Sequence, residues 1–196
     1  MTPQTFLRFL DRMEAMKCNT RHSWTSDGTH ETVAAHSWRL ALMAMMAAPE
    51  LPEVDMNKVL KMCVLHDIGE AVTGDIPSFE KTEANSHTER RAVDGLLARL
   101  GEPLYAQWTA LFDEMEARQT IEAKVFKALD RMEAVIQHNE ADLATWLPLE
   151  YELQMTYGVE DAQCHPFLSA LRQQVMEDTQ IKTKTLLGAD SSEKAP

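Results

Sequence analysis

Apolar residues recur at intervals of three and four along most of this chain, a spacing typical of helices that bury one face. We expect helices over residues 5–17, 32–47, 55–73, 86–100, 103–117 and 120–140, a short helix from 148 to 157, and a last helix over 166–187. No stretch of five residues alternates apolar and polar side chains, so no β-strand is expected. The pattern predicts one all-α domain of about seven to nine helices over residues 1–187, with 188–196 a disordered tail.

The predicted helix over 55–73 is apolar nearly all round, which places it at the centre of the domain. Asp55 is suited to cap its first turn, and Gly74 is suited to end it. The segment 18–31 is polar and contains the turn signal Asp27-Gly28, so we interpret it as a loop.

The charge balance limits the classes of partner. The net charge is −12 and the sequence pI is about 5.0, which argues against a nucleic-acid groove or binding to an anionic membrane. A phosphorylated substrate would have to be attracted locally, by a metal ion and a few cationic side chains. Cys18, Cys63 and Cys164 form neither a disulfide pattern nor a zinc spacing. With no signal peptide and no membrane span expected, the chain is predicted to be cytoplasmic.

Four residues of metal-ligand type interrupt three apolar helices. They are His36, the neighbouring pair His66 and Asp67, and Asp130. Each alone is more often a hydrogen-bonded core residue than a ligand, but unpaired buried polar groups are costly, so the set requires a shared partner. Two imidazoles and two carboxylates balance one divalent cation, and nitrogen–oxygen ligation favours a first-row metal over calcium.

Two further carboxylates follow the His66-Asp67 pair. Glu70 lies one helical turn after it and shares part of its face, and Asp75 follows just past the predicted helix end. A carboxylate beside a metal-bound water orients it or takes its proton. We therefore predict Glu70 and Asp75 as catalytic residues, the alternative being solvated surface carboxylates.

Candidate phosphate-binding cations are Arg21, Arg39 and Lys81, with ordinary surface charge as the alternative for Arg39 and Lys81. Trp24 either stacks on a base or sugar or closes its loop over the core. The remaining histidines show no partner pattern and are interpreted as surface or incidental residues: His22, His30, His87, His138 and His165.

The three ligand segments together resemble the HD-domain phosphohydrolase superfamily, and more closely its 5′-deoxynucleotidase branch. The matching strings are ETVAAHSWRLALMAM, HDIGEAVTGDIP and KALDRMEAVIQ. The resemblance implies a helical HD fold, a homodimer, and one Co²⁺, Mn²⁺ or similar ion held by the four ligands. It also implies hydrolysis of nucleoside 5′-monophosphates, preferentially deoxyribonucleotides, with Arg21 on the phosphate, Glu70 and Asp75 assisting water, and Trp24 selecting the sugar.

Other functions stay open from the sequence. They are hydrolysis of a deoxynucleoside triphosphate or of guanosine tetraphosphate, and a non-catalytic, metal-stabilised regulatory module. His87 is the single histidine between Asp67 and Asp130, which favours one metal over two. Ala71 follows Glu70 where guanosine tetraphosphate hydrolases carry Asp, which weakens that alternative.

Overall fold

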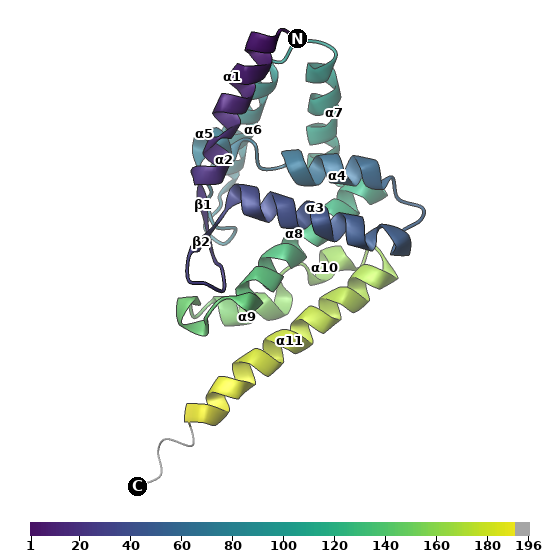
Figure 1. The fold of residues 1–196 in the computed structure, drawn as a ribbon. Helices are drawn as coiled ribbons and strands as arrows, with labels where there is room; N and C mark the ends of the chain where they lie inside the picture. The colour runs from purple at the N-terminus through teal and green to yellow at the C-terminus, as the bar shows by residue number, and fades with distance from the viewer. Residues whose placement is uncertain (191–196) are drawn as a thin grey trace.

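The computed structural model describes the backbone of residues 1–190 and the side chains of residues 1–184. In that part of the chain (Figure 1), the order is α1 (Pro3–Met13), α2 (Ala15–Cys18), β1 (Thr20–Trp24), β2 (His30–Thr32), α3 (Val33–Ala47), α4 (Met56–Leu65), α5 (Glu70–Thr73), α6 (Glu83–Leu97), α7 (Leu104–Ala117), α8 (Ile121–Glu140), α9 (Glu150–Thr156), α10 (Val159–Ala162) and α11 (Pro166–Asp190). Two 3₁₀ turns, Ala48–Glu50 and Leu143–Thr145, complete it. Eight of these helices have seven or more residues, which confirms the predicted all-α class.

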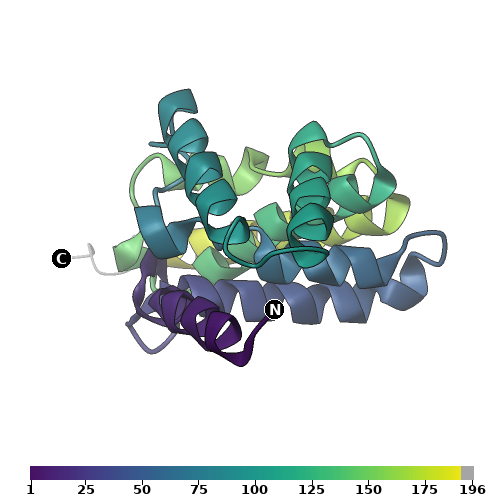
Figure 2. The ribbon, with the colours of Figure 1, turned by 90° about the horizontal axis from the view of Figure 1, so that it is seen from above.

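The centre of the fold is formed by α3, α4 and α8, which pack against one another. Seen from above, α3 and α4 run side by side (Figure 2). Leu40 of α3, Met62 of α4 and Leu129 of α8 have no exposed surface. The predicted central position of the helix after Asp55 is therefore confirmed. Predicted metal ligands lie on α3 and α8, and His66 and Asp67 follow directly after α4.

The predicted single helix over 55–73 is wrong in its second half. Asp55 caps its start by accepting a hydrogen bond from the backbone N–H of Lys58, but α4 ends at Leu65 and α5 begins at Glu70. Between them the bonds follow 3₁₀ spacing, as from Glu70 N to Asp67 O at 2.9 Å. Gly69 lies against α6, where a β-carbon would come within 2.9 Å of Glu89 Cγ, so the close packing of these two segments favours glycine.

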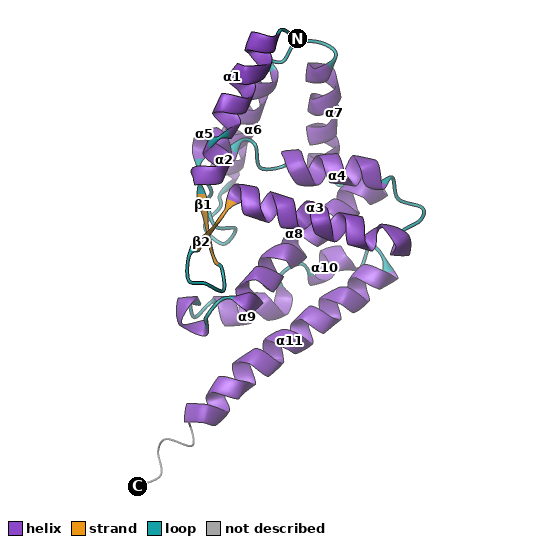
Figure 3. Cartoon of the chain, viewed as in Figure 1, coloured by secondary structure: helices purple, strands orange, loops and turns teal. Residues whose placement is uncertain are grey.

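The predicted loop over 18–31 is also wrong, because it contains a two-stranded antiparallel hairpin. β1 and β2 pair Thr20 with Thr32 and Trp24 with His30. Figure 3 shows the two strands in orange. The predicted turn is confirmed, since Gly28 has a φ of 82°. The strands are short and polar, with only Ser23 and Glu31 buried, so no alternating pattern marks them.

The bounds of two further helices differ from the expected ones. α6 begins at Glu83, behind a capping box formed by Thr82 and Asn85. α11 continues to Asp190, past the predicted end at 187, and the rest of the expected tail, 191–196, lies outside the described residues. None of the described helices is both long and apolar enough to cross a membrane.

Candidate active site

The four predicted ligands meet at one point between α3, α8 and the turn after α4. His36 Nε2 lies 3.2 Å from Asp130 Oδ1 and 3.9 Å from Asp67 Oδ2. His66 Nε2 lies 2.9 Å from Asp67 Oδ2 and 3.6 Å from Asp130 Oδ1. We call this set the four-ligand site. The break after Leu65 matters here, because adjacent residues on a continuous helix point about 100° apart.

Both histidines are oriented through the ring nitrogen that faces away from the site. His36 Nδ1 bonds to the carboxylate of Glu133, and His66 Nδ1 lies 3.0 Å from the carbonyl oxygen of Cys63. A carbonyl only accepts, so His66 carries its hydrogen on Nδ1 and presents the Nε2 lone pair to the site. This is the usual arrangement for metal-binding histidines.

The electrostatics of the site fit a bound cation. Burial and Arg21 lower the pKa of His36, but its bonds to Asp130 and Glu133 outweigh them and raise it to about 9. Burial raises the pKa of Asp130, but Lys127 and the histidines lower it well below its usual range. The Nε2 atom of His66 is buried and makes no hydrogen bond. These donors are suited to one divalent first-row metal ion.

Glu70 lies beside the four-ligand site and is almost completely buried. Its burial, together with repulsion from Asp67 and Asp75, raises its pKa to about 10. Its Oε2 atom has no hydrogen-bond partner, and its backbone carbonyl accepts from Asn19 Nδ2 at 2.6 Å. Burial also raises the pKa of Asp75. Both carboxyl groups therefore hold a proton more strongly than exposed ones do.

Arg21 of β1 reaches the same site from the hairpin. Its guanidinium lies 3.6 Å from Glu31 and 3.9 Å from Asp67. Burial lowers its pKa, but Glu133, Asp67 and Glu31 outweigh that effect and raise it. A local cation thus stands at the site of a strongly acidic protein, as phosphate attraction requires.

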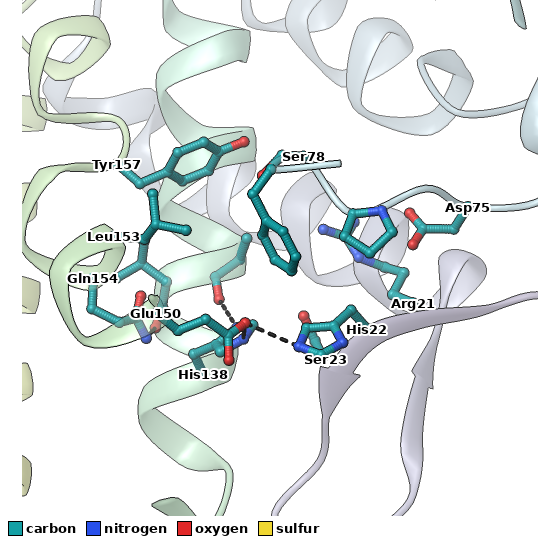
Figure 4. Close-up of a pocket in the computed structure, with 14 residues that line it drawn as sticks. Arg21, His22, Ser23, Asp75, Ser78, His138, Glu150, Leu153, Gln154 and Tyr157 are labelled. Carbon is teal, nitrogen blue, oxygen red and sulfur yellow. Dashed lines mark hydrogen bonds and ion pairs between the residues drawn. The ribbon is translucent and has the colours of Figure 1, made fainter. Parts of the chain in front are cut away.

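A pocket opens beside Arg21, and we call it the hairpin pocket. Its lining combines aromatic, apolar and polar side chains: Arg21, His22, Ser23, Asp75, Pro77, Ser78, Phe79, Ala134, Val135, His138, Glu150, Leu153, Gln154 and Tyr157. Figure 4 shows Arg21 and Asp75 on one side of it, with Leu153 and Tyr157 across from them. The pocket therefore adjoins the four-ligand site through two of the predicted functional residues.

Three other predicted substrate contacts do not line the hairpin pocket. Arg39 Nε donates to Glu133 at 2.6 Å, so it supports the partner of His36 and does not face the pocket. Lys81 pairs with Glu89 in a separate hollow that also contains His66 and Asp67.

Trp24 is outside the hairpin pocket. Its ring lies 3.7 Å, centre to centre, from His30 across the hairpin. Its carbonyl accepts from Gln137 Nε2 at 2.7 Å, which ties β1 to α8.

Sequence reasoning missed several residues of the site. Glu133 has no exposed surface and lies one turn after Asp130, on the same face of an apolar helix, which is a usable signal. Glu31 is buried in the hairpin, and Lys127 Nζ donates to Asp130 at 2.7 Å.

For two histidines the interpretation as incidental is wrong. His22 lies 3.0 Å and His138 lies 2.8 Å from Oε1 of the buried Glu150. All three residues line the hairpin pocket.

A helical core with two histidines and two aspartates from three helical segments defines the HD-domain class. A profile described as "HD domain" matches residues 13–172, and the chain belongs to this family. The family predicted from the sequence is confirmed.

Relatives of known name agree with this assignment. The chain is 28% identical over 141 residues to 5′-deoxynucleotidase HDDC2 of Bos taurus, covering 70% of this chain and 68% of that protein. It is 30% identical over 138 residues to 5′-deoxynucleotidase hdd1 of Schizosaccharomyces pombe, covering 66% and 68%. A solved structure from Magnetospirillum magnetotacticum, titled a "predicted metal-dependent phosphohydrolase", has a TM-score of 0.78 at 25% identity and covers 92% of this chain and 93% of that one.

Proposed function

We propose that this protein is a metal-dependent phosphohydrolase that converts nucleoside 5′-monophosphates, preferentially deoxyribonucleotides, to nucleoside and phosphate. The observation that carries the proposal is the four-ligand site, with Glu70 beside it and Arg21 joining it to the hairpin pocket. The names of the relatives support the same reaction.

His36, His66, Asp67 and Asp130 would hold the divalent cation. When bound, that ion supplies an activated water and neutralises charge on the phosphate. Beside that cation, whose positive charge would favour the ionised carboxylate, Glu70 would direct the attacking water or take its proton.

The remaining residues position the phosphate and the nucleoside. Arg21 holds the phosphate oxygens that face away from the cation, and Asp75, on the same side of the pocket as Arg21, assists Glu70. Phe79 and Tyr157 give the hairpin pocket the flat apolar walls that suit a base. The ring of Trp24 packs on His30 outside the hairpin pocket, so Trp24 would influence sugar selection indirectly, by positioning β1. Lys81 lines the second hollow together with His66 and Asp67, where its positive charge would help to bind the phosphate.

We also propose that residues 1–187 form the catalytic domain of a cytoplasmic homodimer. Trp38, Leu42, Met45 and Met46 lie along one face of α3 and are all exposed, which suits burial against a second copy. The three cysteines are unpaired, as expected in a reducing compartment. Light scattering of the wild type and of Trp38→Glu tests the dimer, and a monomeric wild type would contradict it.

The test of function is a substrate panel on metal-stripped protein reloaded separately with Co²⁺, Mn²⁺, Mg²⁺ and Zn²⁺. We expect metal-dependent phosphate release from deoxyribonucleoside 5′-monophosphates, more slowly from ribonucleotides, and none from Asp67→Asn. Deoxynucleoside triphosphates and guanosine tetraphosphate are the controls.

The panel also separates the alternatives left by the sequence. Cleavage of a control with no release from monophosphates would keep the four-ligand site but refute the proposed substrate. If metal binding raises the melting temperature but no phosphate is released from any compound, the result would refute the enzyme and favour the non-catalytic regulatory module.

A further inference from the structure

A second cluster of metal-ligand side chains lies in the wall of the hairpin pocket, separate from the four-ligand site. His22 of β1, His138 of α8 and Glu150 of α9 each offer one ligand atom, and these atoms lie within 4.8 Å of one another. Figure 4 shows the three side chains meeting in the lower part of the pocket, away from Asp75.

The orientation of His138 is set by the helix that carries it. Its Nδ1 atom lies 3.1 Å from the carbonyl oxygen of Ala134, one turn earlier. Because a carbonyl only accepts, Nδ1 carries the ring hydrogen, and in the neutral ring Nε2 points a lone pair at Glu150 Oε1, 2.8 Å away. Two facing lone pairs repel one another unless a cation, either a proton or a metal ion, lies between them.

Glu150 is held so that one oxygen serves both rings. Its Oε2 atom accepts from the backbone N–H of Leu147 at 2.6 Å, which leaves Oε1 between His22 and His138. The carboxylate is only 3% exposed. The Nε2 atom of His22 is buried without a hydrogen bond, so a proton does not satisfy that contact in the observed geometry.

We propose that His22, His138 and Glu150 form a second metal site, and that its ion is Zn²⁺. Two neutral imidazoles and one carboxylate are a zinc-binding set that leaves a fourth position open. Since all three residues line the hairpin pocket, the open position faces it. Their separations of 2.8 and 3.0 Å resemble the 2.9 and 3.2 Å separations of ligand atoms within the four-ligand site.

The ion would join β1 to two helices that follow it by about a hundred residues or more in sequence. β1, α8 and α9 each contribute one ligand, and β1 also carries Arg21, next to His22. Zinc in this site therefore fixes the strand that presents Arg21, although it does not touch the four-ligand site. The proposal stands whether or not the substrate is a mononucleotide.

The test counts the Zn²⁺ bound by full-length protein that has been stripped of metal and then reloaded with Zn²⁺. We expect two equivalents of Zn²⁺ per chain by mass spectrometry after desalting, one in His138→Ala, one in Asp67→Asn, and none in the double variant. His165→Ala is the matched control, because His165 pairs with Glu53 at 3.3 Å outside the cluster and should leave both equivalents bound.

The proposal would be overturned if His138→Ala still bound two equivalents of Zn²⁺. It would also be overturned if the wild type bound a single equivalent and Asp67→Asn bound none. Circular dichroism checks the fold of each variant. If His138→Ala misfolds, Glu150→Gln replaces it, since glutamine still accepts from the N–H of Leu147. As a readout independent of the count, Zn²⁺ should raise the melting temperature of Asp67→Asn but not that of the double variant. A missing shift in Asp67→Asn would also refute the site.

Discussion

Glu133→Gln tests whether the buried carboxylate behind His36 controls metal binding. Glu133 has no exposed surface and accepts two hydrogen bonds, from His36 Nδ1 and from Arg39 Nε. Glutamine has the same shape but offers one acceptor and one donor. It can satisfy only one of the two donors, unless His36 moves its hydrogen to Nε2, which removes the lone pair from the four-ligand site.

The size of the effect follows from this conflict. Loss of an outer partner of a metal ligand typically lowers metal affinity or activity by about 10–100-fold. That range corresponds to about 1.4–2.7 kcal/mol of binding free energy. A buried donor left unpaired also lowers the free energy of unfolding by about 1–3 kcal/mol.

Isothermal titration of metal-stripped protein with Mn²⁺ measures the metal affinity, and urea unfolding measures the free energy of unfolding. Glu140→Gln is the matched control, because Glu140 bonds to the same Arg39 but its side chain is 50% exposed. Unchanged metal affinity in Glu133→Gln would refute the assignment of Glu133 as the group that orients His36.

Three further predictions concern chemistry, packing and thiols. Glu70→Gln keeps the shape of the side chain but removes a proton acceptor, so turnover should fall about 10²–10⁴-fold with metal affinity retained, and normal kcat would exclude Glu70 as the base. Leu129→Ala should lower the free energy of unfolding by about 2–5 kcal/mol in urea. Leu149→Ala, at 44% exposure, should change it by less than about 0.5 kcal/mol, and equal losses would contradict the assigned core. Burial raises the pKa of the Cys63 thiol to about 12 while Cys18 is exposed, so iodoacetamide should label Cys18 first, and equal labelling by mass spectrometry would contradict this.

Helices were predictable because their apolar spacing is long and regular. The candidate ligands could be selected because polar groups interrupt that spacing, and the structure brings the four side chains, His36, His66, Asp67 and Asp130, close together.

The turn after Leu65 was not predictable from spacing. Its residues continue the helical pattern, and the packing of Gly69 against α6 is a tertiary contact that no local pattern reports.

The hairpin and its contacts were also not predictable from the local sequence pattern. Two strands of five and three mostly polar residues leave no apolar alternation to detect. The pairing of His22 with Glu150 joins positions separated by more than a hundred residues, which no local pattern reports.

The ligands of the four-ligand site come from α3, the turn after α4, and α8, so the site exists only when the central helices have docked. An ion that binds the folded chain and not the unfolded one shifts the folding equilibrium towards the folded state. The supply of metal in the cell would then set how long each copy of the chain survives proteolysis, as well as how fast it turns over. Under metal starvation, we expect the amount of protein and its activity to fall together.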